Sequence, residues 1–338
     1  MRRLSVVILL AAVVMLVGGA GPPRQTSASP GGKMYWTEVG VHIRRANLDG
    51  SMVEVVCTRD SLPTGLALDV ASGTMYWTEG DAIWRATLDC SGVEMLVDGL
   101  SDARLIALDT AASKMYWTAS GTIQRANMEG GSVEDLVTGL GSQWGIALDV
   151  AGGKMYWTEP GTYKIQRANL DGGGVEDLLT TGDRPYGIAL DLAGGKMYWA
   201  ANTKIQRANL DGSGVEDLVT GVVAVGIALD VGGDKMYWTG DLLAGIGRAN
   251  LDGSGVEELT SWEGTDIALD LTAPEPTATP TPTPGAVGGI AELAGVEGAA
   301  LEAQHSSGTD VGFMAAVVAA GVVTLAGGAW YARRRWLR

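Results

Sequence analysis

The chain has 338 residues and a formal net charge of −15 at pH 7. Such an acidic chain is unsuited to binding the phosphates of nucleic acid. It holds only two histidines, His42 and His305, so neither a histidine-based catalytic triad nor a zinc site of several histidines is predicted. No catalytic residue, metal or cofactor is predicted.

The N-terminus is typical of a secretory signal. Arg2 and Arg3 precede the apolar run Leu4–Val17, and the small residues Gly18–Ala20 follow. A basic start, an apolar segment and a small-residue cleavage site together direct a protein to export. We therefore expect residues 1–20 to be a signal peptide that is cleaved near Ala20.

A Tyr-Trp pair then recurs six times at intervals of 41, 40, 40, 42 and 39 residues. A fixed period of this size indicates a repeat architecture. The pairs are Tyr35-Trp36, Tyr76-Trp77, Tyr116-Trp117, Tyr156-Trp157, Tyr198-Trp199 and Tyr237-Trp238.

One copy, starting at residue 145, contains four short β-type runs divided by Gly- and Asp-rich turns. The runs are Ile146–Asp149, Lys154–Thr158, Lys164–Leu170 and Val175–Leu179. None has helical periodicity, which excludes βαβ folds. Four antiparallel strands in about forty residues make one propeller blade. We predict an all-β, six-bladed β-propeller over residues 33–271.

The ends of the repeat region predict how the ring closes. Ala-Leu-Asp also occurs six times, but the first Tyr-Trp strand has no such run before it and the last such run has no Tyr-Trp strand after it. If Ile267–Leu271 pairs with Met34–Glu38, all six blades are complete. This pairing leaves no open sheet edge between the two ends of the repeat region.

The C-terminal part predicts a membrane anchor. Pro and Thr alternate over Pro274–Pro284, which favours a stiff, extended stalk within the linker 272–310. Val311–Ala332 follows as 22 residues without a charge, about 33 Å as a helix, which is enough to span a bilayer. The basic tail 333–338 places the C-terminus in the cytoplasm. We expect a single-pass protein of the cell membrane, held in the lipid bilayer by this helix, with the propeller outside the cytoplasm.

These motifs resemble the YWTD repeats, the class B repeats of low-density lipoprotein receptor relatives. The resemblance covers about Lys33 to Leu271 and includes Tyr-Trp-Thr, Gly-Ile-Ala-Leu-Asp and Ile-x-Arg-Ala-Asn-Leu-Asp-Gly. It implies a six-bladed propeller that binds protein ligands on one face. The family favours Asp at the fourth motif position, whereas this chain has Glu38, Glu79, Ala119, Glu159, Ala201 and Gly240, and the Thr of the fifth copy is Ala200.

The loops that lead from each fourth strand to the next first strand differ between copies. They are Arg59–Thr64, Leu100–Arg104, Gly141–Trp144, Gly182–Tyr186, Val222–Val225 and Trp262–Asp266. All open on one face, together with the loops after Tyr-Trp-Thr. Aromatic residues and arginine are enriched at interface hot spots. The predicted ligand-binding residues are Trp144, Tyr186, Trp262, Arg104, Arg184, His42, Tyr163 and Glu263, and the expected ligand is a protein or peptide.

Two other functions are compatible with the sequence. The aspartates that end the Ala-Leu-Asp runs could serve a metal-dependent hydrolase or lactonase in the central channel, although their position at a turn favours turn capping. The similarity of the copies is also compatible with a structural spacer. These aspartates are Asp69, Asp109, Asp149, Asp191, Asp230 and Asp270.

The two cysteines are expected to be free thiols. Cys57 ends a fourth strand, whereas Cys90 lies in a turn between third and fourth strands. About five residues along the strand axis, or roughly 17 Å, then separate them, whereas a disulfide needs Cα atoms within about 7 Å.

Overall fold

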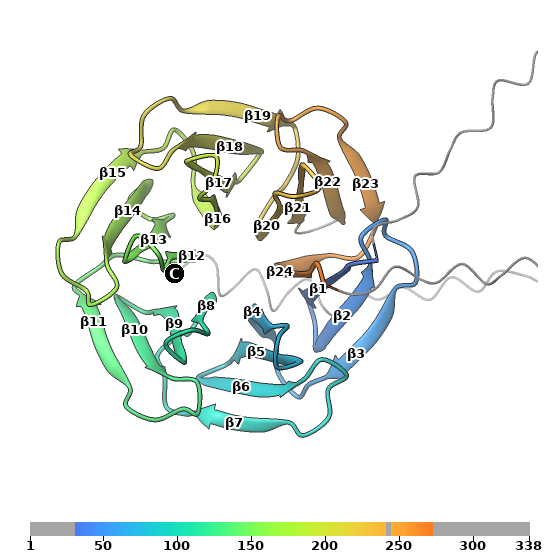
Figure 1. Ribbon diagram of the computed structural model, residues 1–338, viewed down its shortest axis with the longest axis vertical. Coiled ribbons are helices and arrows are strands. Elements are labelled where there is room, and N and C mark those ends of the chain that lie inside the picture. The colour runs from blue at the N-terminus through green and yellow to red at the C-terminus, as the bar shows by residue number, and fades with distance from the viewer. Residues whose placement is uncertain (1–30, 241–244, 273–338) are drawn as a thin grey trace, which may run out of the picture. The chain divides into compact units, whose positions relative to one another are not determined.

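The computed structural model describes residues 31–240 and 245–272, which form six four-stranded antiparallel sheets arranged in a ring (Figure 1). Each sheet is one propeller blade, as predicted. The predicted signal peptide, the membrane span 311–332, the tail and all of the linker after Thr272 lie outside the described residues. Within the described ranges, no helix is long and apolar enough to cross a membrane.

The strands of each blade are given from the channel outward. Blade 1 consists of β24 (Gly264–Asp270), β1 (Lys33–Glu38), β2 (His42–Asn47) and β3 (Glu54–Thr58). Blade 2 consists of β4 (Pro63–Asp69), β5 (Thr74–Glu79), β6 (Ala82–Thr87) and β7 (Glu94–Val97). Blade 3 consists of β8 (Ile106–Asp109), β9 (Lys114–Ala119), β10 (Thr122–Asn127) and β11 (Glu134–Thr138).

The second half of the ring repeats the same order. Blade 4 consists of β12 (Ile146–Asp149), β13 (Lys154–Glu159), β14 (Lys164–Asn169) and β15 (Glu176–Thr180). Blade 5 consists of β16 (Pro185–Asp191), β17 (Lys196–Ala201), β18 (Lys204–Asn209) and β19 (Glu216–Thr220). Blade 6 consists of β20 (Ile227–Asp230), β21 (Lys235–Thr239), β22 (Ile246–Asn250) and β23 (Glu257–Thr260).

The ring closes as the sequence predicts. The last strand, β24, pairs antiparallel with the first, β1, so that Trp36 lies opposite Ile267 and Met34 opposite Leu269. The closing strand starts at Gly264, and the register shifts between Thr37 and Glu38. Blade 1 is therefore built from both ends of the propeller (Figure 1), and neither end leaves an unpaired strand at the junction.

The Met-Tyr-Trp-Thr run is buried on both of its sides. Tyr35, for example, packs against Met75 and Trp77 of the next blade, and Met34, Trp36 and Thr37 are fully buried. Successive side chains of a strand point to opposite faces, so Tyr and Thr contact one neighbouring blade while Met and Trp contact the other. This alternation explains why the motif recurs in every copy.

The motif threonine also joins neighbouring blades by hydrogen bonds. The Thr158 hydroxyl accepts the N–H of Gly145 in its own blade (2.8 Å) and donates to the Tyr186 carbonyl of the next blade. Thr37, Thr78 and Thr118 donate in the same way to the carbonyls of Thr64, Arg104 and Trp144. In blade 5, where Ala200 replaces the threonine, the Gly187 N–H bonds directly to the Val225 carbonyl at 2.7 Å.

The prediction of free thiols is wrong, because Cys57 and Cys90 form a disulfide with their Cα atoms 5.4 Å apart. The turn between the third and fourth strands of each blade packs against the outer strand of the preceding blade. At that turn the other five blades have a glycine with positive φ, and a Cβ on Gly130, for instance, would lie 2.2 Å from the Leu96 carbonyl oxygen. Cys90 occupies this glycine position with φ 66°, so its side chain reaches β3 and links blade 2 to blade 1.

Candidate ligand-binding face

The variable loops occupy one face of the disc, named here the loop face. It carries the connections from each outer strand to the next inner strand, together with the connections between second and third strands. Because neighbouring strands are antiparallel, these connections emerge on the same side. The opposite side, the turn face, carries the turns between first and second strands and between third and fourth strands.

At the inner edge of the loop face, each blade presents the residue that immediately precedes the glycine position of the Gly-Ile-Ala-Leu-Asp motif. Its backbone belongs to the scaffold, because the motif threonines hydrogen-bond the carbonyls of four of these residues. Its side chain varies between blades, with threonine in two of them. The six residues are Thr64, Arg104, Trp144, Tyr186, Val225 and Thr265.

Three of these side chains form a continuous row across blades 3, 4 and 5. The Arg104 guanidinium carbon lies 4.6 Å from the centre of the Trp144 ring. The Trp144 and Tyr186 rings meet edge to face, with centroids 5.4 Å apart and planes at 81°. Asp102 holds Arg104 through a 2.8 Å ion pair. Aromatic and cation–π contacts of this kind stabilise a fixed arrangement of the side chains.

The same row continues to Arg184 and Tyr163. Hydrogen bonds to the hydroxyls of Tyr163 and Tyr186 raise the pKa of Arg184 above its usual value. Tyr163 is 39% exposed, and its carbonyl accepts the Thr181 N–H at 2.7 Å. Five of the eight predicted residues therefore form one connected group, named here the arginine–aromatic row: Arg104, Trp144, Tyr186, Arg184 and Tyr163.

The other three predicted residues lie at blade 1, on the opposite side of the ring from blade 4 (Figure 1). Trp262 is 42% exposed, and the guanidinium carbon of Arg44 lies 3.6 Å from the centre of its ring. Glu38 fixes Arg44 through a 2.9 Å ion pair. The half-buried His42 ring contacts the Thr58 hydroxyl at 3.2 Å, and Glu263 follows Trp262 in the loop.

Sequence reasoning missed a further cation–aromatic cluster in blade 2. Arg59 lies between Trp77 and Trp84, 5.2 Å and 4.5 Å from the two ring centres. Glu79 binds both Arg59 (2.7 Å) and the Trp77 indole N–H (3.0 Å). A signal for this cluster was present, because the residue opposite the motif tryptophan is Gln in blades 3 to 5 but Arg44 in blade 1 and Trp84 in blade 2.

Burial separates the predicted aromatic residues into two kinds. Trp144 is only 4% exposed and packs with Leu105, Ile146 and Trp157 in the core between blades. Trp144 therefore belongs to the core between blades 3 and 4. Its backbone bonds and packing make it part of the scaffold, whereas Trp262 and Tyr163 present accessible ring surface.

The aspartates that end the inner strands cap turns, as the sequence favours. The Asp149 carboxylate accepts the Gly152 N–H at 2.7 Å, and the Asp191 carboxylate accepts the Gly194 N–H at 2.8 Å. Asp69, Asp109 and Asp230 likewise accept the N–H three residues on, whereas Asp270 accepts the N–H of Thr272, two residues on. Within residues 31–240 and 245–272, no three His, Cys, Asp or Glu side chains gather closely enough to hold a metal ion.

One buried carboxylate breaks the symmetry of the channel wall. Asp266 occupies a position where four other blades have glycine, and it is 7% exposed. Its carboxylate accepts the N–H of Leu66 in the next blade (2.8 Å) and of Ile267 (3.0 Å). Burial raises the pKa of Asp266 to about 7, although these two N–H donors oppose the shift.

No protein-family model matches the chain, and neither does any curated protein. Solved structures do match. A chain of a nidogen/laminin complex has a TM-score of 0.64 and 21% identity, over 70% of this chain and 98% of that chain. TolB from Acinetobacter baumannii has a TM-score of 0.58 and 16% identity, over 71% of this chain and 67% of that chain. A putative TolB from Agrobacterium tumefaciens has a TM-score of 0.56 and 16% identity, over 70% and 91%. At these identities the likeness establishes the propeller fold alone.

Proposed function

We propose that this protein is a single-pass membrane protein whose extracytoplasmic propeller binds a protein or peptide ligand through the loop face. The observation that carries the proposal is the clustering of arginine with aromatic rings on this face. Scaffold hydrogen bonds hold the backbone at the inner edge of the face, while the side chains vary between blades.

The exposed members of these clusters have the chemistry of interface hot spots. Trp262 and Tyr163 are 42% and 39% exposed, and both contact an arginine. Large aromatic rings and guanidinium groups contribute most of the binding energy at many protein interfaces. The contacts among Glu38, Arg44 and Trp262 already order these side chains, so ligand binding loses less conformational entropy.

The disulfide supports a location outside the cytoplasm. A disulfide such as Cys57–Cys90 is stable in oxidising compartments and rare in the cytosol. The signal-like N-terminus and the uncharged 22-residue segment near the C-terminus support export followed by anchoring in a membrane.

A protein ligand is also favoured by resemblance. The repeats resemble the YWTD family, which implies protein binding on one face. The similar chain of the nidogen/laminin complex comes from an assembly of two proteins. Neither relation identifies the ligand of this chain, so the ligand has to be captured directly.

The test is capture from membranes of the source organism by the full-length protein, followed by mass spectrometry. The test variant combines Tyr163→Ala, Arg184→Ala and Trp262→Ala, all at exposed loop-face positions. The control variant combines Val150→Ala, Leu192→Ala and Val231→Ala, which are 41%, 44% and 41% exposed on the turn face. Trp144 is left intact because its loss would disturb the core.

We expect wild type and control to capture the same protein, and the test variant to bind it about a hundredfold more weakly, because several hot-spot side chains are lost together. Capture that survives the loop-face changes but not the turn-face changes would assign binding to the wrong side. A wild-type protein that captures nothing specific would favour a structural spacer.

A further inference from the structure

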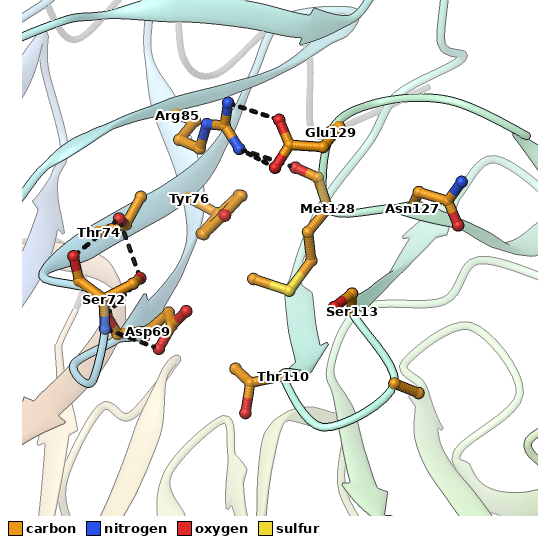
Figure 2. A pocket seen from close by; sticks show the side chains of 11 residues that line it. Asp69, Ser72, Thr74, Tyr76, Arg85, Thr110, Ser113, Asn127, Met128 and Glu129 are labelled. Carbon is orange, nitrogen blue, oxygen red and sulfur yellow. Dashed lines mark hydrogen bonds and ion pairs between the residues drawn. The ribbon is translucent and has the colours of Figure 1, made fainter.

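A pocket of 510 Å³ lies on the turn face between blades 2 and 3. Figure 2 shows Thr74, Tyr76 and Arg85 on its blade 2 side and Met128 and Glu129 on its blade 3 side. The proposed function does not use this pocket, because the pocket is on the face opposite the variable loops.

The pocket coincides with a departure from the repeat pattern. In the other five blades, the second strand starts with a half-buried lysine whose ammonium donates to an asparagine on the third strand. Lys154, for example, donates to Asn169 at 2.6 Å. The pairs are Lys33–Asn47, Lys114–Asn127, Lys154–Asn169, Lys196–Asn209 and Lys235–Asn250.

Blade 2 has Thr74 in place of the lysine and Thr87 in place of the asparagine, and the two lie opposite each other in the same register. Both hydroxyls bond locally, Thr74 with Ser72 (3.0 Å) and Thr87 with Asp89 (2.5 Å). Residue 74 lies on the same side of its strand as Tyr76, which is the side that faces blade 3. Thr74 lines the pocket, so its short side chain leaves free a volume that a lysine side chain fills elsewhere.

The walls of the pocket suit an ammonium group on an alkyl chain. The carboxylates of Asp69 and Glu129 line it, against one guanidinium, that of Arg85. Glu94 (2.5 Å) and Glu129 (2.8 Å) both pair with Arg85 and compensate its charge. The Arg85 guanidinium lowers the pKa of Glu129, which keeps this carboxylate ionised. The Tyr76 ring and the Met128 side chain supply apolar surface for the alkyl chain.

Glu129 is itself a departure from the pattern. The equivalent turn residue is aspartate in the other blades, where it caps its own turn, as Asp171 does by accepting the Gly173 N–H at 2.9 Å. The longer side chain of Glu129 reaches Arg85 in the preceding blade instead. Blades 2 and 3 therefore change together at this junction, the first losing a cation and the second extending a carboxylate toward the space.

We propose that this pocket binds an alkylammonium group, in the place where the other blades hold their own lysine ammonium. Two sources carry this chemistry, the lysine side chain of a partner protein and a free aliphatic amine. Hydroxyl groups of Ser72, Thr74 and Ser113 are available as further acceptors for the three ammonium protons.

The test is a calorimetric titration of the purified full-length protein with two probes, Nα-acetyl-lysine methylamide and 1,5-diaminopentane. Pentanol serves as the uncharged control. We expect saturable binding of at least one amine with a Kd on the order of 1 mM, weakened by added salt, and no binding of pentanol. The probe that binds more tightly distinguishes a lysine side chain from a free amine.

The decisive variant is Thr74→Lys with Thr87→Asn, which restores the pair of the other five blades and should fold for that reason. Its own ammonium should fill the pocket and weaken amine binding about tenfold or more. The matched control, Lys154→Thr with Asn169→Thr, makes the reverse change in blade 4 and should leave the blade 2 pocket able to bind. Absence of saturable amine binding to wild type, or equal binding by the Thr74→Lys, Thr87→Asn variant, would overturn the proposal.

Discussion

Replacing Thr158 by valine tests how neighbouring blades are held together. The Thr158 side chain is fully buried. Its hydroxyl accepts the Gly145 N–H at 2.8 Å and donates to the Tyr186 carbonyl. Valine has nearly the same shape as threonine but cannot hydrogen-bond, so the change removes both bonds with little change in packing.

The expected cost follows from the two groups left behind. A buried donor or acceptor that loses its partner costs about 1–3 kcal/mol. With two such groups, Thr158→Val should lower the free energy of unfolding by about 2–6 kcal/mol. For a domain of this size, each kcal/mol corresponds to about 2–4 °C in Tm, so we expect a decrease of about 4–24 °C. Thr158→Ser keeps the hydroxyl and should cost only about 1 kcal/mol, from the lost methyl group.

Differential scanning calorimetry of the two variants and the wild type measures this difference. Blade 5 offers the structural reason for a different outcome, because there Ala200 is accommodated by a direct bond from the Gly187 N–H to the Val225 carbonyl. If blade 4 can relax in the same way, Thr158→Val will melt within about 2 °C of the Thr158→Ser variant. That result would refute the role assigned to the threonine hydroxyl.

Three further predictions concern the ring as a whole. Cys57→Val with Cys90→Gly restores the residues of other blades but removes a disulfide that links positions 33 residues apart. The free energy of unfolding should fall by about 3–4 kcal/mol and Tm by about 10 °C. An unchanged calorimetric Tm would contradict a stabilising role of the disulfide. Deleting residues 267–271 should abolish cooperative unfolding, because blade 1 loses its inner strand, and a sharp transition would contradict the closure. Burial raises the folded-state pKa of Asp266 from 3.8 to about 7, so the native state binds this proton more tightly than the unfolded chain does. The contribution of Asp266 to the free energy of unfolding is then fully present below about pH 4 and is lost as pH rises to about 7. This loss amounts to up to about 4 kcal/mol. As pH rises over this range, the free energy of unfolding of Asp266→Asn, measured by denaturant titration, should therefore increase relative to that of the wild type. A difference between the two proteins that does not change with pH would contradict the raised pKa of Asp266.

The architecture could be predicted because every repeat carries the same information. Six Tyr-Trp strands and six Ala-Leu-Asp strands out of phase require a closing strand, and β24 supplies it. The alternation of Met, Tyr, Trp and Thr in every copy likewise accounts for the burial of both sides of the strand. In both cases the repeat pattern is sufficient for the prediction, because the same contacts recur at every junction between blades.

The disulfide was missed because it depends on how successive blades are staggered. Distances within a single blade place Cys57 and Cys90 far apart, but the turn of one blade packs against the outer strand of the blade before it. Comparison of the copies shows that Cys90 occupies a glycine position, which is the clue that the turn approaches its neighbour closely. The repeat period alone does not predict the position of one blade relative to the next.

The candidate face could be predicted only in part, for a similar reason. The loops that differ between copies do lie together, and five predicted residues form the arginine–aromatic row. Burial of Trp144 depends on Leu105 at blade 3 and Trp157 in blade 4, and therefore on how these two blades pack. The partners Arg44 and Glu38 were missed because they lie within strands, whereas the candidate residues were sought in the loops that differ between copies.

The most direct test of the proposed function is site-specific photo-crosslinking on intact cells of the source organism. A photoreactive phenylalanine analogue is placed at Tyr163 or Trp262 on the loop face, and at Leu192 on the turn face as a control with 44% exposure. We predict that the two loop-face positions crosslink to the same protein or peptide and that Leu192 does not. Crosslinks from Leu192 alone, or none from Tyr163 and Trp262, would contradict ligand binding through the loop face.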